Sequence, residues 1–123
     1  MLKCRIIPTL LHKDIGLVKG RKFDSWRRVG SALQSVRVYN LRDVDELIFL
    51  DISATPSSRI PDLDQIIEIT KECFMPVTVG GGVRSLEHME NLLRVGADKI
   101  AINTQAIKEP NILKDLSRKF GSQ

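Results

Sequence analysis

Apolar and polar positions follow two periods along the chain, one predicting strands and the other predicting helices. Short, nearly continuous apolar runs occur at residues 5–10, 46–52, 77–79 and 99–103, and such runs are typical of parallel strands covered by other elements. After each run, apolar residues recur at helical spacing. The predicted helices cover residues 32–39, 62–73, 86–94 and 110–120.

These segments form an unbroken series of strand–helix units. Ser85 is positioned to cap the third helix, whereas Gly96 and Gly121 are positioned to end the third and last helices. No linker or low-complexity segment interrupts the series, so residues 1–123 are expected to form one α/β domain around a parallel sheet. The polar residues 11–30 are expected to form a long loop.

The composition is that of an ordinary globular domain, with 42% hydrophobic and 28% charged residues. No apolar stretch approaches the roughly 20 residues that a membrane span needs, and no signal peptide is evident. We therefore expect a cytoplasmic protein without membrane contact. Cys4 and Cys73 have no metal-ligand spacing and are expected to be reduced and structural.

The net charge of +4 arises mainly from a basic stretch. Only 5% of the residues are aromatic and no nucleic-acid-binding motif is present, so a nucleic-acid partner is not expected. Small phosphorylated ligands explain the basic stretch better, although a solvated loop without a ligand is the alternative. The basic residues are Lys13, Lys19, Arg21, Lys22, Arg27 and Arg28.

A glycine-rich turn joins the third predicted strand to the following helix. Gly80, Gly81 and Gly82 follow Val79 directly. Glycines allow positive φ and expose backbone N–H groups, and the helix beyond them carries positive partial charge at its N-terminus. The turn therefore predicts a phosphate site, although many such turns serve only a tight reversal.

Other polar residues end the neighbouring strands. Asp51 follows the second predicted strand, and Asn103 with Thr104 follows the fourth. Ligands of parallel α/β proteins lie beyond the carboxyl ends of the strands. A carboxylate, a backbone anion site and an amide with a hydroxyl suit a sugar phosphate better than a metal or a catalytic nucleophile. Alternatively, Asp51 caps a helix or pairs with Lys19.

Several motifs, spread in order over the whole chain, resemble the cyclase subunit of imidazole glycerol phosphate synthase. That family forms a (βα)₈ barrel of two similar halves, and the resemblance implies that this chain is the N-terminal (βα)₄ half-barrel, whether as a short gene or a truncated form. The motifs are Arg5-Ile6-Ile7-Pro8, Val18-Lys19-Gly20, residues 45–52, residues 78–83, Gly96-Ala97-Asp98-Lys99, Ile102-Asn103-Thr104 and residues 120–123.

The resemblance implies roles for residues at both ends of the barrel. The phosphate site of this half involves Gly82, with the neighbouring Gly81, and Asn103 and Thr104. Catalytic roles fall to the mobile-loop residue Lys19 and to Asp51.

At the opposite end, four charged residues match positions at the entrance of an ammonia channel and at the contact with a glutaminase partner. Ordinary surface charge is the alternative reading of these residues. They are Arg5, Glu46, Asp98 and Lys99.

One departure from the family concerns the catalytic acid–base pair. The family uses two aspartates, but Leu11 occupies the first position and the second lies beyond Gln123. The isolated chain is therefore expected to lack cyclase activity. Leu10, Leu11 and residues 72–76 look closer to cyclase-like paralogues associated with sugar amidation in surface-polysaccharide synthesis.

The expected architecture leaves two open sheet edges, at the first and fourth strands, and an apolar sheet interior. We therefore expect self-association, with a homodimer closing an eight-stranded barrel. No metal or other cofactor is expected. The alternatives are half of an ammonia-dependent lyase or amidation enzyme that becomes active when completed, and a module that only dimerises.

Overall fold

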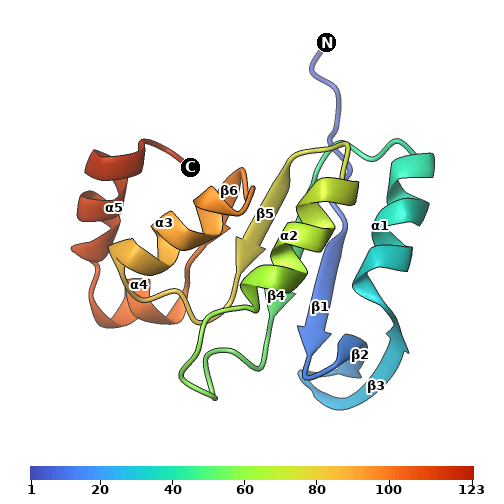
Figure 1. The fold of residues 1–123 in the computed structure, drawn as a ribbon, viewed down its shortest axis with the longest axis horizontal. Helices are drawn as coiled ribbons and strands as arrows, with labels where there is room; N and C mark the ends of the chain where they lie inside the picture. Colours follow the sequence, from blue (N-terminus) through green and yellow to red (C-terminus); the bar gives the residue numbers. More distant parts are fainter.

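The computed structural model describes residues 1–123 as one layer of strands with helices packed against it (Figure 1). The elements in chain order are β1 (Thr9–Lys13), β2 (Gly16–Arg21), β3 (Asp24–Gly30), α1 (Ala32–Leu41), β4 (Leu47–Asp51), α2 (Leu63–Glu72), β5 (Val77–Gly80), α3 (Leu86–Arg94), β6 (Lys99–Ala101), α4 (Thr104–Lys108) and α5 (Ile112–Phe120).

The strands form one six-stranded sheet in the order β3-β2-β1-β4-β5-β6. β1, β4, β5 and β6 run parallel to one another, whereas β2 pairs antiparallel with both β1 and β3 and continues the sheet beyond β1 as a hairpin. The arrowheads of β1, β4 and β5 point the same way in Figure 1, so the loops that follow them gather at one end of the molecule. This alternation of parallel strands and helices is the architecture of half a (βα)₈ barrel, as the sequence predicts.

The core lies between the sheet and its helices. Along β4, Leu47 and Phe49 are fully buried under the helices, whereas Ile48 and Leu50 on the other face are only half-buried. Their partners in the main core cluster include Val36 of α1, Ile66 of α2 and Leu92 of α3, among others. The helices therefore cover one face of the sheet and leave the other face partly open to solvent.

Local signals explain where the predicted helices begin. Ser31 precedes α1 and its Oγ accepts from the N–H of Gln34 at 3.3 Å. Asp62 and Ser85 cap α2 and α3 in the same way. Such caps satisfy backbone donors that a first helical turn leaves free.

The bounds of the observed elements confirm the four predicted helices and the three later strands, with ends shifted by a few residues.

The first predicted strand lies too early in the chain. The ladder with β4 begins at Thr9 and not at Arg5. The carbonyls of Ile6 and Pro8 accept hydrogen bonds from Asp45 and Ile48, but Pro8 has no N–H to donate. A regular strand therefore starts only after the proline.

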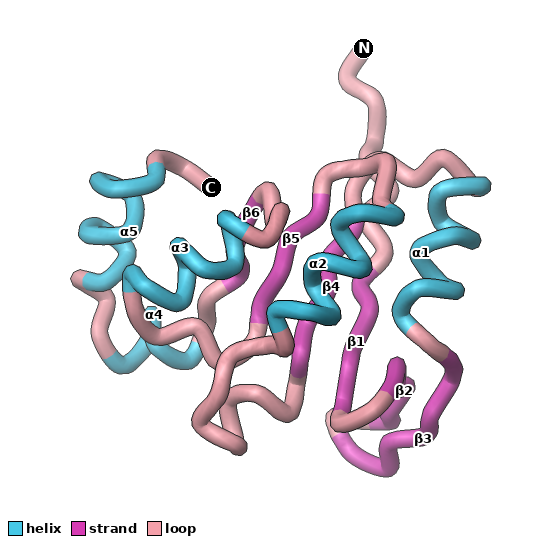
Figure 2. The backbone as a smooth tube through the Cα atoms, in the orientation of Figure 1, coloured by secondary structure: helices cyan, strands magenta, loops and turns pink.

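The predicted loop at residues 11–30 is instead the carboxyl end of β1 followed by the β2–β3 hairpin (Figure 2). Its turn places Lys22 and Phe23 at positive φ, at 51° and 62°. Hairpin turns of this kind favour Asn-Gly or Asp-Gly, which the sequence lacks here, so the hairpin could not be recognised. The short helix α4 was also not predicted, because five residues show no periodicity.

The edges of the sheet differ from the prediction as well. β2 pairs with His12 and Lys13 of β1, so the carboxyl end of β1 is not an open edge. At the other side, the carbonyl of Gln123 accepts from the N–H of Ile100 in β6. Thr9, Leu10 and Leu11 pair only with β4, so this part of β1 still has a free side.

Candidate functional site

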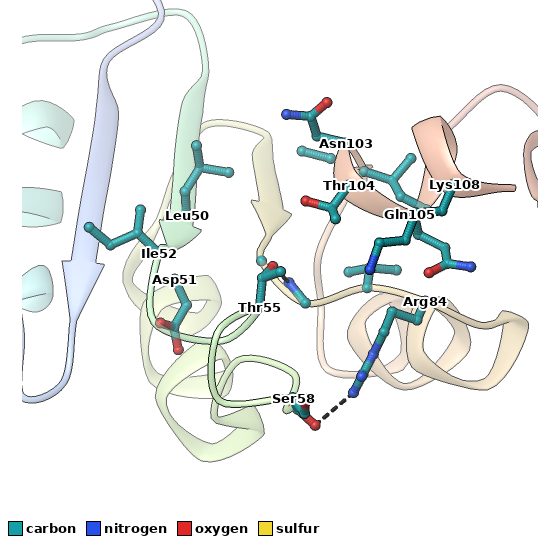
Figure 3. Close-up of a pocket in the computed structure, with 15 residues that line it drawn as sticks. Leu50, Asp51, Ile52, Thr55, Ser58, Arg84, Asn103, Thr104, Gln105 and Lys108 are labelled. Carbon is teal, nitrogen blue, oxygen red and sulfur yellow. Dashed lines mark hydrogen bonds between the residues drawn. The ribbon is translucent and has the colours of Figure 1, made fainter. Parts of the chain in front are cut away.

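A cavity of about 380 Å³ lies at the carboxyl ends of β4, β5 and β6 (Figure 3). The loop after β4, the glycine-rich turn after β5 and helix α4 complete its walls. In Figure 3, Asn103 and Thr104 lie across the cavity from Leu50 and Thr55. The predicted phosphate residues Gly81, Gly82, Asn103 and Thr104 thus line one cavity, and Asp51 also borders it.

The glycine-rich turn requires glycine at two positions. Gly81 and Gly82 have positive φ, at 118° and 65°. A Cβ on Gly81 would overlap the carbonyl oxygen of Asp51, and one on Gly82 would overlap that of Arg59. The N–H of Gly82 donates to Thr55 Oγ1 at 3.1 Å, whereas the N–H groups of Gly81 and Val83 donate to no protein atom. The turn is therefore packed tightly and keeps free backbone donors.

Asn103 and Thr104 precede and begin α4, and both are exposed. The Asn103 side chain makes no capping hydrogen bond to the helix. Its amide and the Thr104 hydroxyl remain available to a ligand in the cavity. The polar side chains predicted at this strand end are thus exposed and line the cavity.

Two cations that sequence reasoning missed also line the cavity. Arg84 comes from the turn after β5 and Lys108 from the end of α4. Neither forms an ion pair with a carboxylate, and Arg84 donates through Nη2 to the Ser58 carbonyl at 2.6 Å. Lys108 follows Thr104 by about one helical turn, so the two residues lie on the same side of α4. This spacing would have identified Lys108 as a cavity residue only if α4 had been predicted.

The Asp51 carboxylate is buried and already paired. Its side chain is 2% exposed. One oxygen accepts from the N–H and Oγ of Ser53 at 3.0 and 2.7 Å, and the other accepts from Arg59 Nη1 at 2.6 Å. The partner of Asp51 is therefore Arg59 and not Lys19. A catalytic role for Asp51 remains a prediction from the resemblance.

Lys19 does not reach this cavity. It lies exposed on β2, directly opposite Arg27 of β3, and lines a separate groove along the hairpin. Its catalytic role likewise remains a prediction.

At the amino ends of the strands, Glu46 joins two predicted channel residues. Its carboxylate accepts from Arg5 at 2.9 Å and from Lys99 at 2.8 Å. The hydrogen bond from Lys99 is the main reason why the pKa of Glu46 lies below its ordinary value of 4.5. Asp98 accepts from the N–H of Val77 at 2.8 Å. The structure thus brings Arg5, Glu46 and Lys99 into one ion-pair cluster, with Asp98 beside β5.

No group of three or more His, Cys, Asp or Glu side chains is arranged to hold a metal ion. None of the helices has the length and apolar character needed to cross a membrane.

Comparison with known proteins agrees with the motifs. Residues 5–123 match the family model described as "Histidine biosynthesis protein". The chain is 46% identical over 123 residues to "Putative imidazole glycerol phosphate synthase subunit hisF2" of Campylobacter jejuni and 43% identical to the protein of the same description in Pseudomonas aeruginosa. It is 46% identical to "Imidazole glycerol phosphate synthase subunit HisF" of Streptococcus mutans. Each match covers 100% of this chain but 49% of the relative, so the chain spans about half the length of these relatives.

Proposed function

Because the chain belongs to the histidine biosynthesis protein family and corresponds to the N-terminal half of HisF, we propose that it binds a phosphate or sugar phosphate in the cavity beyond β4, β5 and β6. The ligand contacts would come from the turn at Gly81 and Gly82 and from Asn103 and Thr104. In this proposal the chain supplies the phosphate-holding half of a cyclase-type barrel.

The charge balance of the cavity is the observation that carries this proposal. Its only carboxylate, Asp51, is neutralised by Arg59, while Arg84 and Lys108 have no acidic partner. An anion would balance these two cations and accept hydrogen bonds from the free N–H groups of the turn. Hydrogen bonds to charged groups are stronger than those between neutral groups.

The test is titration of the 123-residue chain with inorganic phosphate, followed through backbone amide NMR signals at constant ionic strength. Lys108→Gln is expected to weaken phosphate binding by about fivefold, which corresponds to roughly 1 kcal/mol, the net contribution of a typical hydrogen bond. Lys114→Gln, which removes an exposed lysine from α5 outside the cavity, serves as the matched control.

Signals of Gly81, Val83 and Thr104 should move most. Absence of any shift at these residues, or equal weakening in the Lys114→Gln control, would contradict the proposal.

We further propose that the barrel is completed by a second half, either another copy of this chain or a separate chain. The half-open sheet face and the free side of β1 at Thr9–Leu11 support this. The cluster of Arg5, Glu46 and Lys99 at the far end would then face a glutaminase, as the resemblance implies.

The isolated chain is proposed to lack cyclase activity. Leu11 pairs with Leu50 on the half-open face, where the family resemblance implies a proton-transferring aspartate. A leucine side chain cannot transfer protons, and a positioned acid or base contributes about 10²–10⁴-fold to a rate. An ammonia-dependent lyase or sugar-amidation enzyme, active when completed, is the alternative. Turnover with ammonium salts, once a second half completes the barrel, would favour that alternative.

A further inference from the structure

Asp51 faces the helix side of the sheet. Burial along β4 alternates, and Asp51 shares the covered face with Leu47 and Phe49. Its carboxylate accepts three hydrogen bonds, from Ser53 N, Ser53 Oγ and Arg59 Nη1. Both carboxylate oxygens are therefore already engaged in holding the local structure.

Arg59 closes the loop that follows β4 onto itself. Its Nη2 donates to Ser53 Oγ at 2.8 Å, and its Nη1 also donates to the Ile60 carbonyl at 3.2 Å. The backbone N–H of Arg59 donates to the Ala54 carbonyl at 3.0 Å. The Asp51–Arg59 pair thus connects the start of the loop at residues 52–61 with its end.

The same loop forms one wall of the cavity. Thr55 Oγ1 accepts from the N–H of Gly82, and the Ser58 carbonyl accepts from Arg84. The Arg59 carbonyl lies so close to Gly82 that no side chain would fit between them. A change in the shape of the loop would therefore displace both the glycine-rich turn and one of the two cavity cations.

We propose that Asp51 is a positioning residue: its ion pair with Arg59 fixes the loop at residues 52–61, and through Thr55 and Ser58 that loop sets the anion-binding geometry of Gly82 and Arg84. This inference rests on the proposed phosphate site. It assigns Asp51 an indirect role in ligand binding.

The sign of a mutational effect separates this role from simple electrostatics. Asp51 is the only carboxylate that lines the cavity. Removal of its negative charge in Asp51→Asn should strengthen phosphate binding if charge alone mattered. If Asp51 acts by positioning, the same variant weakens phosphate binding because the turn and Arg84 shift.

The double variant Asp51→Asn/Arg59→Gln keeps the net charge. Electrostatics therefore predicts no change in phosphate binding, whereas positioning again predicts weaker binding.

The experiment is NMR titration of the full 123-residue chain and these variants with inorganic phosphate at constant ionic strength. Asp51→Asn and the double variant are expected to bind phosphate about fivefold more weakly or worse. Glu90→Gln is the matched control, because it also removes one carboxylate. Glu90 lies on α3, away from the cavity, and forms ion pairs with Arg94 and Lys119. The control is expected to bind like the wild type.

Each outcome of these titrations supports or contradicts the positioning role of Asp51. Phosphate binding by folded Asp51→Asn that is as tight as in the wild type, or tighter, would overturn the inference. If Asp51→Asn does not fold, the double variant gives the answer, because neutral replacement of both partners of this partly buried pair is tolerated better than an unpaired charge. If the wild type binds no phosphate, the proposed phosphate-binding function is wrong, whatever the role of Asp51. The positioning role is then tested by the amide chemical shifts of Gly82 and Arg84 without ligand, which must differ between the wild type and the double variant.

Discussion

At the scale of single residues, His12 shows how burial changes an ionisable group. Its side chain lies under the helices, with Gln65 Nε2 at 3.0 Å from its Nε2 and no partner for Nδ1. Burial is the main reason why the pKa of His12 falls below its ordinary value of 6.5; Asp51 opposes this shift and Arg59 supports it. The folded protein thus prefers the neutral ring.

This predicts acid sensitivity with a defined direction. Below pH 6.5 the unfolded chain binds a proton at this histidine before the folded chain does, so the free energy of unfolding falls as pH decreases towards the lower pKa of folded His12. Urea unfolding at pH 7.5 and at lower pH values measures it. His12→Gln should lose less stability than the wild type over the same interval. Equal acid sensitivity in the two proteins would argue against His12 as the cause.

At the scale of elements, the turn after β5 needs glycine mainly because the neighbouring backbone leaves no room for a side chain. Gly82 shows this most clearly. In the structure, a Cβ at this position would overlap the Arg59 carbonyl first, and φ is 65°. The turn and the loop at residues 52–61 therefore pack as one unit.

Gly82→Ala is accordingly predicted to lower the stability of the fold. A left-handed residue costs about 1–2 kcal/mol, and overpacking adds about 1–3 kcal/mol. Gly121→Ala is the control for a positive φ, since Gly121 has φ of 83° and ψ of −147°, but a Cβ added there would approach only the Gln123 side chain. It should lose only the conformational part, about 1–3 kcal/mol, and Gly82→Ala should lose more. Urea unfolding compares the two variants, and equal losses would show that the contact with Arg59 is unimportant.

At the scale of the whole molecule, the chain exposes more surface than its size predicts. A folded monomer of 13.9 kDa typically exposes about 6,700 Å², whereas this chain exposes 8251 Å². Only 24 of its 123 residues are buried, and Ile6 is 64% exposed. The excess is roughly twice the ~800 Å² that one partner contributes to a standard-size interface, and falls in the range of larger obligate interfaces. These observations support the proposal that a second half covers the open sheet face.

We predict that the chain self-associates at micromolar concentration, as a dimer or larger assembly, when light scattering is measured after size-exclusion chromatography. Ile48→Lys should shift the population towards monomer, because it places a charge on the half-open face of β4. Leu113→Lys, on an exposed position of α5, is the control for added charge. A well-folded wild-type monomer under these conditions would contradict the prediction.

The sequence by itself determined the helices, the later strands and the family. These follow from local causes: apolar spacing within one element, capping residues such as Ser85 and glycines that end helices. It also identified Gly81, Gly82, Asn103 and Thr104 as neighbours, because parallel strands bring their carboxyl ends to one edge.

Only the tertiary structure decided which groups meet. Asp51 pairs with Arg59 because the loop after β4 folds back on itself, and Arg84 and Lys108 share a cavity although they come from different elements. Glu46 pairs with Arg5, from the segment before β1, and with Lys99 of β6. The hairpin at β2–β3 forms without the usual turn residues, stabilised by pairing along the sheet. Such contacts depend on the path of the chain in space, which the spacing of residues along a sequence does not specify.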